Sequence, residues 1–203
     1  MDHRDTLYID LLRHGEPVGG QKYRGGVDDP LSERGWEQMR YAASGETPWR
    51  GIVTSPLRRC REFAEELGLK HQIPVATDPR LREVGFGEWE GLTKPEVLAK
   101  YGSLLGLFLQ DPVTHRPPGA ESLHEFAGRV SAGFDDVLKN HLFEGGHVLV
   151  ICHAGVIRAI LHRVLSIPLE NLYRIQVQTG HVTRIRIDAE GRPAMMFHGR
   201  RRL

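Results

Sequence analysis

The chain has little cysteine, no excess of either charge and no long apolar run. Cys60 and Cys152 are its two cysteines, and they do not form a C-x-x-C pair. Both lie in apolar or helical contexts, which favours buried free thiols over a disulfide. Lysine and arginine number 27 against 26 acidic residues, which argues against a nucleic-acid partner, because such partners require a basic excess. No apolar run approaches the roughly 18 residues that cross a bilayer, so no membrane-spanning segment is expected.

The remaining composition is that of a soluble globular protein. The 203 residues, 40% hydrophobic and 26% charged, fit one domain that is large enough to bury a core. Residues 1–5 are charged and lead directly into a strand-like run, so we expect no secretory signal. A cytoplasmic location is the default expectation.

Short apolar runs predict the strands, which we place at residues 6–12, 51–54, 73–78, 147–152, 173–178 and 182–187. The run at 147–152 is the strongest, because four apolar residues follow one another without a polar break. That pattern suits a parallel strand that is buried on both faces. The last two runs are predicted to pair antiparallel around a turn at Gly180.

Helical periods lie between these runs. Ser32 can cap a first helix, residues 57–67 form a second, and apolar residues at helical spacing predict two more at 123–138 and 156–165. This alternation predicts an α/β fold: a three-layer sandwich with a mostly parallel central sheet and helices on both faces. The stretch 85–119 interrupts the alternation, and we interpret it as a small inserted lid over the active-site edge.

Polar side chains follow the predicted strands where parallel sheets bind ligands, beyond their carboxyl ends. The first strand leads into Arg13-His14-Gly15-Glu16, the second into residues 54–59, and the fourth into Cys152-His153-Ala154-Gly155. Arg80, Arg82 and Glu83 come soon after the third. The topology therefore predicts that two histidines, several arginines and a carboxyl group meet at one edge of the sheet.

This combination suits phosphoryl transfer. Guanidinium groups match phosphate oxygens, an imidazole nitrogen can be a nucleophile, and a carboxyl group can protonate a leaving oxygen. Helix N-termini after His14 and His153 would add backbone donors. Phosphoryl transfer needs mainly positioning and neutralised charge, which these groups can supply without a metal or another cofactor.

Simpler explanations exist for each residue alone. The chain has 11 histidines, Arg13 could pair with Glu16, and residues 58–61 could be a solvated helix face. Two histidines and a carboxylate could also bind zinc. Zinc is disfavoured because the chain has no H-E-x-x-H or C-x-x-C spacing, and because the arginines would repel a cation. The joint placement at strand ends favours phosphate.

Four motifs resemble those of the histidine phosphatase superfamily, also called phosphoglycerate mutase-like. They are Leu-Arg-His-Gly-Glu at 12–16, Thr-Ser-Pro-Leu-Arg-Arg at 54–59, residues 81–91, and Cys-His-Ala-Gly at 152–155. The similarity runs from about Leu7 to Ile187. It implies that His14 is the nucleophile, that Glu83 is the proton donor, and that the phosphate ligands are Arg13, Arg59 and His153. Gly15 and Ala154 fall among the substrate-binding positions.

The chain also departs from the family pattern. Pro17 and Gly20 stand where many members have Thr or Ser and then Asn, which puts one phosphate contact in doubt. Arg24 lies where the family often places a substrate-facing arginine, and we assign it to substrate binding. Residues 23–36 and the segment Pro-Gly-Ala-Glu-Ser at 118–122 look most like alpha-ribazole phosphatases, which act in cobalamin biosynthesis. The alternative is that these are a cap, a turn and a helix start.

The expected function is hydrolysis of a small-molecule phosphate monoester through a phosphohistidine. A cofactor-dependent phosphoglycerate mutase is the nearest alternative, because it shares the four motifs, although we expect mutases to be longer and to shield the phosphohistidine from water. A non-catalytic phospho-ligand binding module is the third. The apolar patch at 104–108 has two explanations, a homodimer interface or a cover for the site.

Overall fold

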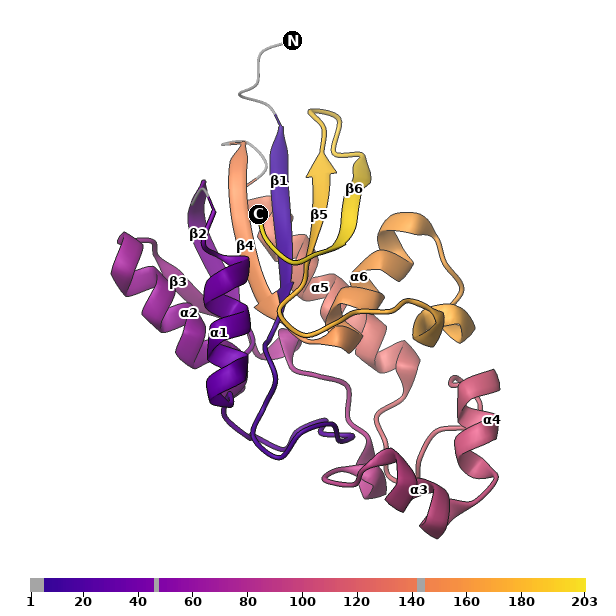
Figure 1. Ribbon diagram of the computed structural model, residues 1–203. Helices are drawn as coiled ribbons and strands as arrows, with labels where there is room; N and C mark the ends of the chain where they lie inside the picture. The colour runs from indigo at the N-terminus through magenta and orange to yellow at the C-terminus, as the bar shows by residue number, and fades with distance from the viewer. Residues whose placement is uncertain (1–5, 46–47, 142–144) are drawn as a thin grey trace.

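The computed structural model describes residues 6–45, 48–141 and 145–203. The predicted absence of a signal at residues 1–5 lies outside this range. Within it, the strands form one sheet in the order β3-β2-β4-β1-β5-β6 (Figure 1). The strands are β1 (Leu7–Arg13), β2 (Trp49–Thr54), β3 (Val75–Thr77), β4 (Gly146–Cys152), β5 (Val182–Ile187) and β6 (Pro193–Arg200). The first four pair in parallel, and β5 is antiparallel to both β1 and β6, so the mostly parallel sheet is confirmed.

The strongest predicted strand occupies the position that its sequence requires. β4 lies between β1 and β2, and its last five residues are all buried. A strand with sheet neighbours on both sides and helices on both faces meets no water, which explains its unbroken apolar run.

The prediction of a strand at 173–178 is wrong. Residues Leu169–Arg174 form the 3-10 helix η5, and residues 175–178 belong to no strand. The apolar side chains in this stretch, among them Tyr173 and Val177, pack on the main core cluster instead. β5 instead pairs antiparallel with β1 and with β6. β6 has no clear apolar alternation, because it is an edge strand with half-exposed side chains.

Helices cover both faces of the sheet, as expected. α1 (Glu33–Ala42) and α2 (Arg58–His71) lie on one face, and α5 (Leu123–His141) and α6 (Ala154–Leu165) lie on the other (Figure 1). Two buried apolar clusters fill the layers between the sheet and the helices. Ser32 caps α1 by accepting a hydrogen bond from the Gly35 N–H at 3.0 Å, which confirms the predicted start of that helix.

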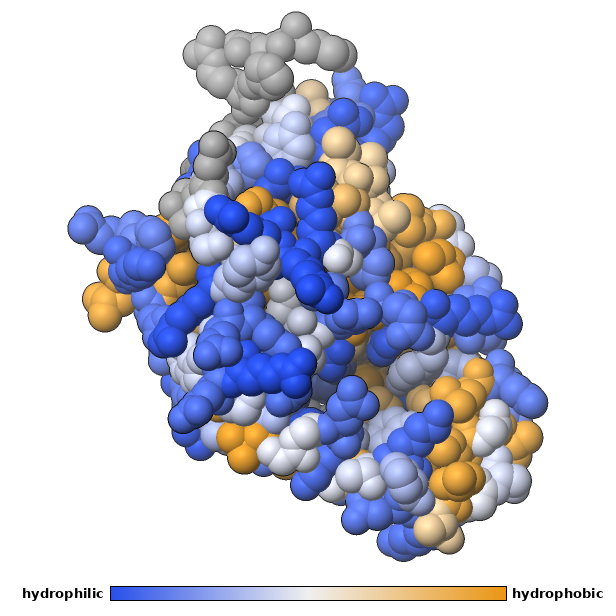
Figure 2. Space-filling model, in the orientation of Figure 1, coloured by the Kyte–Doolittle hydropathy of each residue, from blue (hydrophilic) through white to orange (hydrophobic). Residues whose placement is uncertain are grey.

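The predicted lid segment contains the 3-10 helix η3 (Gly87–Trp89), α3 (Lys94–Tyr101) and α4 (Leu104–Gln110). Figure 1 shows α3 and α4 beyond the carboxyl ends of the parallel strands. The apolar patch at 104–108 divides between core and surface: Phe108 is 1% exposed and Leu107 40%. Apolar side chains gather over α4 in Figure 2. A homodimer contact through them stays a prediction, as does the role of the segment as a lid.

No helix in the described part of the chain is long and apolar enough to cross a membrane.

Candidate active site

The strand register brings the two motif histidines together. Arg13 at the end of β1 is opposite Cys152 at the end of β4, and Thr54 of β2 is opposite Ile151. The next residues along the three strands are therefore His14, His153 and Ser55. The two imidazole rings lie edge to face, with their centroids 5.1 Å apart and an interplanar angle of 62°.

The His14 ring is buried, and its hydrogen bond fixes which nitrogen is free. Nδ1 lies 2.7 Å from the carbonyl oxygen of Gly15. A carbonyl can only accept, so Nδ1 carries the proton and Nε2 keeps its lone pair. The loop turns here against the first turn of α1, where a Cβ on Gly15 would lie 2.1 Å from the Gly35 carbonyl oxygen. The expected helix N-terminus after His14 is wrong, because the next helix begins at Glu33.

Two arginines lie beside these rings with part of their hydrogen-bonding capacity unused. Arg59 is 1% exposed, and its guanidinium donates to the carbonyl oxygens of Val27 at 2.7 Å and Gly25 at 3.2 Å. Arg13 donates to the Val177 carbonyl oxygen. The Nε of each is buried and has no hydrogen-bond partner among the described residues.

The arginines of α2 test the alternative explanation that residues 58–61 form a solvated helix face. Arg58 pairs with Glu62 at 2.6 Å, and Arg61 pairs with Glu65 at 3.1 Å, both at i,i+4 spacing on the exposed side. Arg59 points the other way, into the protein. The solvated-face explanation is thus correct for its neighbours and wrong for Arg59 itself.

The cluster carries buried positive charge. Burial lowers the pKa of Arg13 to about 10, against an opposing effect of Glu83 and with further lowering by Arg158, Arg59 and Arg24. Burial, followed by Arg13 and Arg59, lowers the pKa of His14 well below its ordinary value. Burial and Arg59 do the same for His153. These shifts favour the neutral form of both rings, and the guanidinium groups beside them make a cationic cluster that favours an anion.

Glu83 lies at the N-terminus of α6. Its Oε1 accepts hydrogen bonds from the N–H groups of Gly155 at 3.1 Å and Val84 at 3.0 Å. A Cβ on Gly155 would lie 2.2 Å from this oxygen, so glycine is needed for the approach. The helix N-terminus expected after His153 exists, with Ala154 as its first residue, and Glu83 occupies one of its donors.

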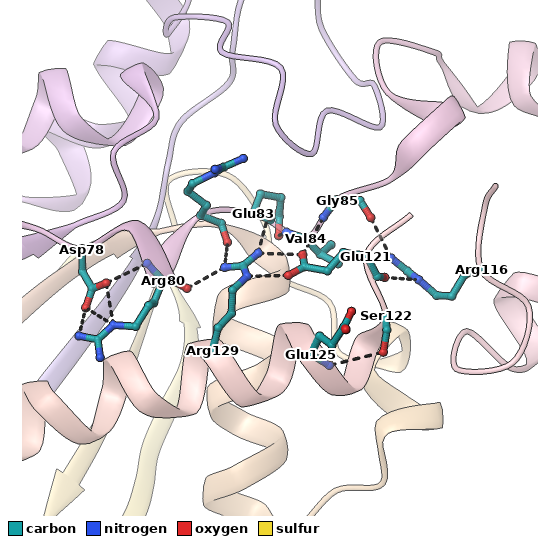
Figure 3. Close-up of polar contacts among 11 residues, drawn as sticks. Asp78, Arg80, Glu83, Val84, Gly85, Arg116, Glu121, Ser122, Glu125 and Arg129 are labelled. Atoms are coloured by element: carbon teal, nitrogen blue, oxygen red, sulfur yellow. Dashed lines mark hydrogen bonds and ion pairs between the residues drawn. The ribbon is translucent and has the colours of Figure 1, made fainter. Parts of the chain in front are cut away.

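An arginine on α5 holds the segment that carries Glu83 (Figure 3). Arg129 donates to the carbonyl oxygens of Arg80, Arg82 and Glu83 at 2.7, 2.8 and 3.0 Å. It also forms an ion pair with Glu121 at 2.6 Å, and Glu121 in turn accepts from the Gly85 N–H at 3.0 Å. Sequence reasoning missed this clamp, although Glu121 lies in a segment that it singled out.

The other two arginines expected near Glu83 have different surroundings. Arg80 forms ion pairs with Asp78 at 2.7 Å and with Asp136 on α5 at 2.8 Å. The side chain of Arg82 is exposed. Arg80 is therefore already paired with two carboxylates.

Arg24 is fixed by its own loop. It is 8% exposed and donates to Asp29 at 2.9 Å, to the Val18 carbonyl oxygen at 2.8 Å and to the Gly20 carbonyl oxygen at 2.6 Å. Gly20, which stands in place of the usual asparagine, thus supplies a backbone acceptor that orients Arg24. The charge of Arg24 also acts on Arg13 and His14, so it lies near the cluster.

The described residues contain no group of three or more His, Cys, Asp or Glu side chains arranged to hold a metal ion. Cys60 and Cys152 are both free and buried, which confirms the expected thiols.

Comparisons with known proteins identify a family that matches most of the chain. Residues 9–198 match the family model of the histidine phosphatase superfamily, branch 1. A relative named putative phosphoserine phosphatase 2, from Hydrogenobacter thermophilus, is 30% identical over 89% of both chains. A relative named 2,3-bisphosphoglycerate-dependent phosphoglycerate mutase 2, from Gloeobacter violaceus, is 32% identical over 83% of this chain and 80% of its own length. The chain spans only half the length of some mycobacterial relatives.

Solved structures agree on the fold. A mycobacterial glucosyl-3-phosphoglycerate phosphatase has a TM-score of 0.83 at 26% identity, covering 96% of this chain and 99% of the other. A putative alpha-ribazole-5'-P phosphatase from Escherichia coli has a TM-score of 0.83 at 23% identity, covering 97% and 98%. At 23% identity, the similarity to the second structure supports the fold alone.

Proposed function

Because this chain belongs to the histidine phosphatase superfamily, we propose that it hydrolyses small-molecule phosphate monoesters through a phosphohistidine at His14. The resemblance inferred from the four motifs is thereby confirmed at the level of the family. The observation that carries the proposal is a neutral, buried His14 with a free Nε2, set among guanidinium groups that have unused N–H donors.

In the first step, Nε2 of His14 attacks phosphorus in line with the ester oxygen, and the P–O bond to the leaving group breaks. Arg13, Arg59 and His153 bind the three non-bridging oxygens and neutralise their charge. Glu83 in its protonated form gives its proton to the leaving alkoxide. Arg24 and the backbone at Gly15 and Ala154 bind the substrate around the phosphate.

In the second step, water attacks the phosphohistidine, Glu83 accepts a proton from that water, and the N–P bond breaks to release phosphate. His14 and the protonated Glu83 are then restored. The reaction uses no metal or other cofactor.

The test replaces the nucleophile. Because His14→Ala has no attacking nitrogen, we expect its hydrolysis of p-nitrophenyl phosphate to fall to background, whereas the wild type retains its rate in EDTA. His124→Ala, an exposed histidine on α5, is the matched control and should keep full activity. Turnover by His14→Ala would overturn the proposal, and loss of wild-type activity in EDTA would favour the metal alternative.

The leaving group is a separate proposal. The resemblance of residues 23–36 and 118–122 to alpha-ribazole phosphatases supports alpha-ribazole 5'-phosphate as substrate, in a cytoplasmic enzyme of cobalamin biosynthesis. The relatives' names add phosphoserine and glucosyl-3-phosphoglycerate to the panel to be assayed. The substrate with the highest kcat/KM identifies the leaving group.

A mutase is the second candidate, favoured by the 32% identical relative with that name. It predicts interconversion of 2- and 3-phosphoglycerate when bisphosphoglycerate is present. Release of inorganic phosphate without interconversion would exclude it.

A further inference from the structure

The side chain beneath the second histidine has no role in the mechanism above. Ser55, at the end of β2, places its Oγ 2.7 Å from Nε2 of His153. Both residues are 0% exposed, so water does not reach this contact. The Ser55 Oγ also accepts a hydrogen bond from the Leu57 N–H at 3.3 Å.

The hydroxyl group decides which ring nitrogen carries the proton. It has one hydrogen and two lone pairs, and the Leu57 N–H uses one lone pair. Over residues 6–45, 48–141 and 145–203, Nε2 of His153 is the one acceptor placed to receive the hydroxyl hydrogen. If Nε2 carried a proton, that hydrogen would be buried without an acceptor, which costs about 1–3 kcal/mol. Nε2 therefore accepts.

Cys60 does not change this assignment. Its Sγ lies 3.6 Å from Nε2 and 3.5 Å from the Cys152 carbonyl oxygen. The carbonyl can receive the S–H, and an S–H directed to the ring would also need an unprotonated nitrogen.

We propose that Ser55 is a positioning residue, which holds the neutral His153 ring with its proton on Nδ1 so that this N–H can bind the transferring phosphoryl group. The proposal rests on the proposed function. Nδ1 has a weak neighbour among the described residues, the Cys60 Sγ at 3.9 Å, so its N–H is available to a phosphate oxygen.

The two neighbouring histidines then have the same tautomer and opposite roles. The Gly15 carbonyl oxygen accepts a hydrogen bond from the Nδ1–H of His14 and leaves Nε2 free to attack. The Ser55 hydroxyl donates a hydrogen bond to Nε2 of His153 and leaves the Nδ1–H of that ring free to donate. A neutral imidazole has a single N–H, so losing this control would turn a donor into an acceptor that repels the phosphate oxygen.

The direct test is the tautomer itself. In ¹⁵N NMR of the uniformly labelled wild type at neutral pH, the imidazole signal that disappears in His153→Ala should show protonated Nδ1 and unprotonated Nε2. A protonated Nε2 in the wild type would overturn the proposal, and this measurement needs no variant at Ser55 to fold.

Variants at β2 give the functional readout. Ser55→Ala removes the donor to Nε2, so we expect an Nε2–H population and a kcat about 10-fold lower, less than the about 10²–10³ for complete loss of one oxyanion donor. Ser55→Thr keeps the hydroxyl and should keep the Nδ1–H signal. The matched control is Thr54→Val, which removes the neighbouring buried hydroxyl, a group that contacts backbone carbonyls, and should leave kcat nearly unchanged.

The outcomes separate the two proposals. An unchanged tautomer and kcat in Ser55→Ala would overturn the role of Ser55 while leaving the phosphatase intact. A wild type with the Nδ1–H signal but no turnover of any phosphate monoester would overturn the function while leaving the tautomer assignment.

Discussion

Strand β1 carries two charged side chains, the buried Asp10 and the partly buried Arg13, whose surroundings are opposite. Asp10 is 0% exposed and fully bonded: it accepts from Arg184 at 2.7 and 3.0 Å and from the Trp49 indole N–H at 2.8 Å. Arg13 has a buried Nε without a partner among the described residues, and burial, followed by other guanidinium groups, lowers its pKa against the opposing effect of Glu83. The ion pair of Asp10 has its hydrogen-bond partners inside the protein, whereas the cationic cluster around Arg13 has unused donors and favours binding of an external anion.

The pKa shifts point the same way. Burial alone would raise the pKa of Asp10, but His147, Arg184 and Trp49 outweigh it and lower the pKa. The folded protein thus stabilises the charged form of Asp10. For Arg13 the folded protein destabilises the charged form. Substitutions at the two positions should therefore separate stability from activity.

The largest effect is expected from Asp10→Ala. It leaves the Arg184 guanidinium partly buried without its carboxylate, which lowers the free energy of unfolding by about 3–5 kcal/mol. The kcat of the molecules that remain folded should be close to that of the wild type. Urea denaturation and an active-site-titrated assay check the two halves, and a stable Asp10→Ala protein would show that the ion pair does not hold β1 to β5.

The same ion pair gives a pH dependence with a defined sign. The pKa of Asp10 is lower in the folded state than its ordinary value of 3.8, so its stabilisation is complete above about pH 4 and is lost as the pH falls through the lowered pKa. Asp10→Asn should be less stable at neutral pH and lose less on acidification. Equal acid sensitivity of the two proteins would assign the effect to other groups.

The second-largest effect is expected from Arg13→Met, which should lower activity without lowering stability. Removing a proposed phosphate ligand should lower kcat by about 10²–10³. Replacing an incompletely satisfied buried charge by an apolar side chain of similar length is often neutral or stabilising by about 1–4 kcal/mol, so the free energy of unfolding should not fall. Steady-state kinetics and urea denaturation measure both, and a loss of stability as large as that of Asp10→Ala would remove the distinction between the two clusters.

The smallest effect is expected from adding inorganic phosphate. Inorganic phosphate at about 100 times its Kd should raise the free energy of unfolding by about 2.7 kcal/mol, because it satisfies the guanidinium groups. Arg13→Met should lose most of this increase and Asp10→Ala should keep it. Thermal denaturation in phosphate against chloride of equal ionic strength checks this, and equal stabilisation of both variants would place the binding elsewhere.

Sequence patterns predicted the elements that carry local signals. The unbroken apolar run of β4, the Ser32 cap and the apolar spacing of α5 are properties of neighbouring residues, so they could be read without the fold. β6 could not, because an edge strand with half-exposed side chains has no periodic apolar face. Tyr173 and Val177 misled the strand prediction, because their apolar side chains reach the core from a 3-10 helix and a loop.

The candidate site divides in the same manner. The motifs placed His14 and His153 directly after β1 and β4, and Arg59 soon after β2 in the first turn of α2, because the residues that follow an apolar strand are fixed by the chain. The contacts that fix the site were not predictable: the Arg129 clamp on Glu83 and the Ser55 hydroxyl beneath His153 join groups that lie far apart in the sequence.

The sequence by itself therefore determined where the buried strands lie along the chain, the residues that follow them, and the family to which the chain belongs. Only the tertiary structure decided which charges are satisfied: it joins Asp10 to Arg184, 174 residues away, and leaves the Nε of Arg13 without a partner among the described residues. The physical reason is that apolar periodicity specifies which face of a strand is buried, but strand order and register decide which polar groups meet.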